Sequence, residues 1–173
     1  MEIKVTNCPD RKFIKYIKKA IHFYDQELLI NRRISSNCYL HIKFDQKLDH
    51  YGSCEVSGFN SKNEPRVFLI MMHPGLGARK ILETLAHEMV HIKQLINKET
   101  NYTFQKWKGE IVDENIDYWD LPWELEAFGK EYGLSVKFAH EEKLWLVFEE
   151  FSNPDEPLES IGINWRNGNN KKS

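Results

Sequence analysis

The residues of this chain best suited to chemistry are the two histidines and the glutamate of His87-Glu88-Met89-Val90-His91. Histidines four positions apart project from the same face of an α-helix, about one turn from each other. Their imidazoles can therefore converge on one metal ion. Glu88 is rotated by about 100° from His87, so it can stand beside the metal without binding it and accept a proton from water. The pattern predicts a site for metal-assisted hydrolysis.

A third metal ligand has to come from elsewhere, because a catalytic zinc usually takes three protein ligands and leaves a fourth position for water. The acidic pair Glu124 and Glu126 lies at a predicted helix start, within Pro122–Ala127. Two positions correspond to about 200° of helix rotation, so only one of these carboxylates can face the metal. Among other histidines, His140 follows Glu124 and His73 precedes the metal-binding helix. The residues alone predict Glu124 or Glu126 as the third ligand.

The segments that carry these residues resemble the gluzincin metallopeptidases, which combine a His-Glu-x-x-His helix with a glutamate on a second helix. Thr84–Gln94 and Pro122–Ala127 are most similar to small, SprT-like and minimal single-domain peptidases of phage and bacterial type. The resemblance extends over residues 65–130 and is specific at these two motifs. It implies an α+β, zincin-like fold, Zn²⁺ as the cofactor, and zinc metalloendopeptidase activity on a peptide or protein substrate.

The resemblance also distinguishes between the two glutamates. In gluzincins the third-ligand glutamate often stands three positions before a small residue, and Glu124 has this relation to Ala127. Glu126 remains the alternative. Family members commonly carry Asp directly after this Ala, where it orients a ligand histidine, but this chain has Phe128. Another group is therefore expected to orient that histidine. SprT-like enzymes with a histidine as third ligand or an added zinc ribbon fit less well.

Hydrolysis at such a site assigns further roles. Glu88 is expected to act as the general base towards zinc-activated water and then to protonate the leaving amine. The oxyanion needs a second donor, for which the candidates are Tyr118, Tyr102, Tyr132 and His73. The strand at 66–71 is expected to be the edge with which an extended peptide pairs.

Two other functions remain open on the same residues. One is a zinc-binding interaction module that keeps a zincin fold but does not hydrolyse its partner. The other is a nucleic-acid-associated, SprT-like protease that binds through Lys12, Lys15, Lys18 and Lys19. The near-neutral charge argues against this third interpretation, because nucleic-acid-binding domains are usually strongly basic.

The metal-binding motif lies in a predicted α+β arrangement. Helical periodicity predicts an N-terminal helix over 10–31 and the metal-binding helix over 78–97. Strands are expected at 38–44, 53–59 and 65–72, paired as a small, mostly antiparallel sheet, and a hairpin is expected around Lys108-Gly109. A glutamate-bearing helix begins near Pro122, and Gly133 leaves its length open.

Composition sets the outer bounds. The chain has 173 residues, 41% of them hydrophobic, and a formal net charge of −2, which fits one domain over 1–151 with a poorly ordered tail over 152–173. The core is large enough that a metal is expected for chemistry rather than for folding. We hypothesise that the apolar segment Ile161–Trp165 docks over the cleft. Three cysteines, which cannot all pair, and no signal-like segment favour the cytoplasm (the host cytoplasm if viral). No apolar run is long enough to span a membrane. The chain is expected to be a monomer.

Overall fold

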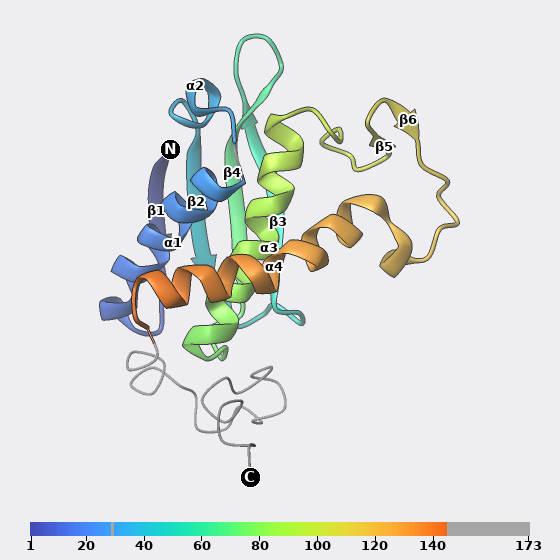
Figure 1. Cartoon of the computed structure of the whole chain (residues 1–173). Coiled ribbons are helices and arrows are strands. Elements are labelled where there is room, and N and C mark those ends of the chain that lie inside the picture. The colour runs from blue at the N-terminus through green and yellow to red at the C-terminus, as the bar shows by residue number, and fades with distance from the viewer. Residues whose placement is uncertain (29, 145–173) are drawn as a thin grey trace.

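A computed structural model of the chain describes residues 1–28 and 30–144 (Figure 1). Its helices and strands, in chain order, are β1 (Glu2–Thr6), η1 (Arg11–Phe13), α1 (Ile14–Glu27), α2 (Arg32–Ser35), β2 (Tyr39–Phe44), β3 (Gly52–Phe59), β4 (Pro65–Met72), α3 (Ala78–Ile96), β5 (Lys106–Trp107), β6 (Glu110–Ile111), η2 (Tyr118–Asp120) and α4 (Pro122–Glu141). This confirms the α+β class. The boundary predicted at 151, the tail and the segment Ile161–Trp165 lie outside the described residues.

The main sheet is mixed, so the prediction of a mostly antiparallel sheet was wrong. Its strand order is β1-β2-β4-β3, with β1, β2 and β4 parallel and only β3 antiparallel to its neighbour β4. The run Val67–Met72 is almost continuously apolar, which suits a strand with neighbours on both sides and at least one covered face. β4 therefore takes an inner position, while the more polar β3 takes the edge. Strand β1 was not predicted from the sequence.

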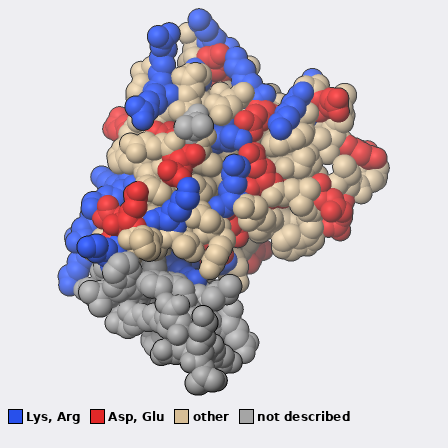
Figure 2. Space-filling model, in the orientation of Figure 1, with Lys and Arg blue, Asp and Glu red and all other residues tan. Residues whose placement is uncertain are grey.

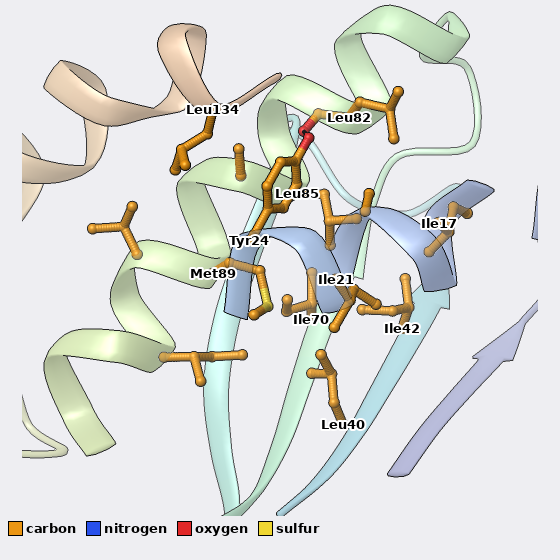
Figure 3. Packing of buried hydrophobic residues seen from close by; sticks show 14 of the residues in the cluster. Ile17, Ile21, Tyr24, Leu40, Ile42, Ile70, Leu82, Leu85, Met89 and Leu134 are labelled. Atoms are coloured by element: carbon orange, nitrogen blue, oxygen red, sulfur yellow. Dashed lines mark hydrogen bonds between the residues drawn. The ribbon is translucent and has the colours of Figure 1, made fainter. Parts of the chain in front are cut away.

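Helices α1 and α3 lie on one face of this sheet, and α4 packs across them (Figure 1). The core lies between them and the inward-facing side chains of β2 and β4, and Figure 3 shows Leu40, Ile42 and Ile70 of the sheet beneath residues of α1 and α3. Tyr24 of α1 is fully buried, and its hydroxyl donates a hydrogen bond to the carbonyl of Leu82 in α3 at 3.1 Å. This contact ties the N-terminal helix to the helix that carries the histidines.

The predicted helices are confirmed, but the N-terminal one is shorter at both ends than expected. The helix expected over 10–31 begins as η1, where the Asp10 side chain accepts a hydrogen bond from the Lys12 amide, and α1 ends at Glu27. Helix α3 matches its prediction almost residue for residue. Helix α4 has Pro122 in its first turn and continues through Gly133, because Leu134 and Phe138 beyond the glycine are buried in the core.

The predicted hairpin is also confirmed. β5 and β6 pair antiparallel around Lys108 and Gly109, whose φ values of 49° and 94° are those of a turn with two left-handed residues. It lies in the long connection between α3 and α4, which leads the chain from the end of one helix to the start of the other (Figure 1).

The surface and the cysteines add little to the functional argument. On the face seen in Figure 2, Lys and Arg side chains alternate with Asp and Glu, and Lys19 forms an ion pair with Glu142. Cys8, Cys38 and Cys54 are free thiols. None of the described helices combines the length and apolar character needed to cross a membrane.

Candidate metal centre

Helix α3 buries the whole His-Glu-x-x-His motif. His87, Glu88 and His91 are 8%, 4% and 6% exposed, although all three are polar. The Nε2 atoms of the two histidines are 3.1 Å apart, as the one-turn spacing predicts. Burying polar side chains costs free energy unless they find partners, so their partners define the site.

Glu124 brings a carboxylate to the two histidines from the first turn of α4. Its Oε2 lies 3.2 Å from Nε2 of His87, and its Oε1 lies 3.6 Å from Nε2 of His91. Among the described residues, these three side chains form a group whose possible ligand atoms all lie within 4.8 Å of one another. The packing of α4 against α3 creates this juxtaposition, since the residues are distant in the sequence.

Glu126, the alternative third ligand, lies on another side of α4. Its carboxylate contacts Lys93 Nζ at 2.7 Å and accepts a hydrogen bond from Gln94 Nε2 at 3.0 Å. Lys93 also pairs with Glu99 at 2.6 Å. As the helix rotation requires, only one glutamate of the pair faces the histidines, and it is Glu124.

Each histidine is oriented through its other ring nitrogen. Nδ1 of His87 lies 2.6 Å from Oε2 of Glu131, and Nδ1 of His91 lies 3.0 Å from Oε1 of Gln94. Gln94 uses its amide nitrogen to donate to the Trp123 carbonyl at 2.9 Å, which fixes the direction of its oxygen. Both Nδ1 atoms face acceptors, which favours the neutral tautomer with its hydrogen on Nδ1 and with Nε2 free to bind a metal ion.

This donor set fits a cation. When both histidines are neutral in this tautomer, two Nε2 lone pairs and a carboxylate converge, and their mutual repulsion is relieved by a positive charge placed between them. The separations of 3.1, 3.2 and 3.6 Å are close to the spacing of about 3.3 Å between tetrahedral ligands of zinc, given bonds of about 2.0–2.1 Å. Nitrogen and carboxylate ligands in this number are those of catalytic zinc sites.

The pKa shifts of His87 and Glu124 also indicate that the cluster stabilises a positive charge. Burial lowers the pKa of His87, but its hydrogen bonds to Glu124 and Glu131 outweigh burial and raise that pKa to about 9. Burial raises the pKa of Glu124, but hydrogen bonds with His87 and His91 outweigh it and lower that pKa to about 2. A proton on His87 thus fills the role that a metal ion would otherwise take.

Glu88 stands beside this centre as the sequence predicts. Its side chain lines a cleft of about 450 Å³, and no described group donates a hydrogen bond to its carboxylate. Burial raises its pKa, and the charges of His91 and His87 oppose that rise. A buried carboxylate without a hydrogen-bond donor, open to a cleft beside a candidate metal centre, is suited to accept a proton from water.

Tyr118 is the only one of the four predicted oxyanion donors that lies at the centre. Its hydroxyl donates to Oε2 of Glu124 at 2.9 Å, and its ring lines the cleft. Burial and the Glu124 charge raise the pKa of Tyr118, so it stays a donor. Tyr102 stacks on Phe59 beside a different pocket, and His73 accepts a hydrogen bond from the amide of Gly75. Tyr132 is exposed and does not line the cleft.

The strand expected to be a free edge is not one. β4, which contains 66–71, is paired on both sides, so its backbone groups are already used. The edge on this side of the sheet is β3, which begins with Gly52 in the lining of the cleft. An extended peptide would therefore pair with β3, and the earlier expectation is corrected in this respect.

Sequence reasoning missed Glu131 and Gln94, although both carry a periodic signal. Glu131 lies seven positions after Glu124, and Gln94 seven after His87, a spacing that returns to nearly the same helix face. Trp123 is buried at 5% exposure, but Trp119 is 64% exposed and lines the cleft.

Replacing Glu131 by glutamine is expected to weaken zinc binding by about 10–100-fold without unfolding the protein, since outer partners of ligand histidines contribute about that much to affinity. Competition with a chromophoric chelator measures this. Glu141→Gln, an exposed position on the same helix, is the matched control. Equal zinc affinities for the two variants would show that Glu131 does not orient His87.

Gly52 allows β3 to lie close to α3 at the cleft. A Cβ there would stand 2.6 Å from Cγ2 of Thr84 and 3.3 Å from Oε1 of Glu88. Gly52→Ala is therefore expected to lower the free energy of unfolding by about 1–3 kcal/mol, as overpacking does. Gly129→Ala, where a Cβ meets nothing within 4 Å, should be neutral or stabilising by up to about 1 kcal/mol. Urea unfolding of both variants tests the difference, and equal losses would contradict it.

Comparisons of the chain with protein-family models, with curated proteins and with solved structures gave no match.

Proposed function

We propose that this chain is a zinc-dependent metallopeptidase of gluzincin type, with a zincin-like domain that hydrolyses peptide bonds. The observation that carries the proposal is the convergence of the Nε2 atoms of His87 and His91 with the carboxylate of Glu124, while the Nδ1 atom of each histidine faces an acceptor oxygen. These three residues would hold the zinc. When bound, zinc supplies Lewis acidity that polarises a peptide carbonyl and acidifies water.

The protein groups account for the proton transfers. Glu88 accepts one proton from water while the water oxygen attacks the carbonyl carbon. Glu88 then passes this proton to the amine nitrogen as the C–N bond breaks. The immediate products are a carboxylic acid and an amine, and the proton of the acid moves to the amine, so that a carboxylate and an ammonium group leave the site. The hydroxyl of Tyr118, held at the centre by Glu124, is the proposed donor to the developing oxyanion.

Binding of substrate is proposed to use the free edge of β3. An extended peptide paired with this strand would run past Gly52, whose lack of a side chain keeps the backbone close to Thr84 and Glu88. Backbone pairing positions a peptide without regard to its sequence, so selectivity must come from side-chain pockets.

The test is cleavage of a peptide mixture by the zinc-loaded protein, compared with Glu88→Gln. A zinc-binding module that hydrolyses nothing would bind the metal equally well and leave the mixture intact. The comparison therefore separates the enzyme from the interaction module.

A further inference from the structure

The cleft beside Glu88 has an aromatic wall. Trp119 packs on Phe128 with ring centroids 5.1 Å apart, and Tyr118 packs on Trp119 at 5.5 Å. Trp119 is 64% exposed and Phe128 37% exposed, and all three rings line the cleft. Large aromatic side chains gathered in an open cleft usually mark a surface that a ligand covers.

This wall extends to the candidate metal centre. The ring of Phe128 packs edge-on against His87, with centroids 4.6 Å apart. Phe128 occupies the position where related peptidases commonly carry an aspartate, and Glu131 binds His87 Nδ1 in this chain instead. The carboxylate is thus supplied from nearly one turn further along α4, and an apolar ring takes its place next to the histidine.

The charged side chains around the cleft are already engaged within the protein. Lys80 pairs with Glu83 at 3.4 Å and lies over the ring of Tyr51, with Nζ 4.9 Å from the centroid. His50 contacts Asp49 at 2.7 Å, and Glu131 is held by His87. Among the described charged groups that line the cleft, only the carboxylate of Glu88 has no hydrogen-bond or ion-pair partner. The proposed reaction uses this carboxylate. The remaining lining consists of four aromatic rings together with Gly52 and Thr84, so it favours an apolar ligand group over a charged one.

From this geometry we infer that the cleft receives a bulky apolar side chain of the substrate, with aromatic side chains preferred, next to the bond that is cleaved. The inference rests on the proposed function and names its substrate class. The volume of the cleft, about 450 Å³, lies within the range of about 300–1,000 Å³ that is typical of ligand pockets. Trp119 determines this specificity, because it is the most exposed ring of the wall and contacts no candidate metal ligand.

Binding to the full-length, zinc-loaded Glu88→Gln variant tests the inference without turnover. The probes are acetyl-Ser-Gly-Ala-Phe-Ala-Ser-amide and the same peptide with Ala in place of Phe, measured by calorimetry. The Phe peptide is expected to bind at least tenfold more tightly, because a filled apolar pocket typically discriminates by about 10–200-fold. Adding Trp119→Ala should reduce this ratio to less than threefold, and Trp119→Phe should restore most of it. Tyr102→Ala, which removes an aromatic ring that is 55% exposed at the other pocket, should leave the ratio unchanged.

Equal binding of the two peptides, or no binding of either, overturns the inference. Cleavage by the wild-type protein separates this result from a failure of the proposed function. If the wild-type protein cleaves a peptide mixture without preferring sites next to bulky apolar residues, the peptidase proposal holds and the pocket proposal is refuted. Selective binding of the Phe peptide without cleavage of any bond refutes the peptidase and supports the pocket.

Discussion

Glu88→Gln is expected to reduce the rate of peptide cleavage by at least about 10²–10⁴-fold while zinc stays bound at one equivalent. General acid–base catalysis contributes about this factor, and an amide cannot accept the proton that the carboxylate takes from water. The variant should fold, because glutamine has nearly the same shape and the carboxylate has no hydrogen-bond donor to lose among the described residues. Mass spectrometry of a digested peptide mixture measures the activity, and elemental analysis measures the zinc.

The matched control is Glu27→Gln, whose carboxylate pairs with Lys137 on the surface. It should cleave at the wild-type rate. Cleavage by Glu88→Gln at a similar rate would remove Glu88 from the mechanism. A wild-type protein that holds zinc but cleaves nothing would favour the non-hydrolytic module.

Removing a ligand is expected to abolish stoichiometric zinc. His87→Ala and Glu124→Ala each take away one of three donors, so the loss of affinity should exceed the roughly 10–100-fold effect of an outer partner. Glu126→Ala should keep one equivalent, because its carboxylate contacts Lys93 and Gln94 rather than the donor atoms, and Lys93 retains Glu99 as a partner. Elemental analysis after gel filtration in zinc-free buffer measures the content.

The same variants decide between the two glutamates. Zinc retained by Glu124→Ala and lost by Glu126→Ala would reverse the assignment. Circular dichroism serves as the control for folding. We expect chelated wild-type protein to keep its helical signal, since the buried cluster of α1, α3 and the sheet is built from apolar contacts. A folded wild-type protein that takes up no zinc would refute the metal centre altogether.

Local patterns in the sequence determined much of this molecule. The apolar periodicity predicted α1 and α3, because a helix must bury one face and its apolar residues therefore recur at spacings of three and four. The proline in its first turn predicted the start of α4. The same periodicity placed His87 and His91 on one face, and the 200° between Glu124 and Glu126 meant that only one could join them. The dipeptide Lys108-Gly109 predicted its hairpin for a similarly local reason.

Only the tertiary structure decided which distant groups meet. Strand order depends on pairing between segments far apart in the chain, so the apolar run of β4 is compatible with an inner position, but the strands that flank β4 and the direction in which each pairs could not be read from it. The partner of His87 was equally hidden. The resemblance implied an aspartate directly after Ala127 as the group that orients a ligand histidine. The packing of α4 on α3 instead brings Glu131 to Nδ1 of His87 and places the Phe128 ring against the His87 ring. A helix periodicity shows which residues share a face, whereas the crossing of two helices decides which of them touch.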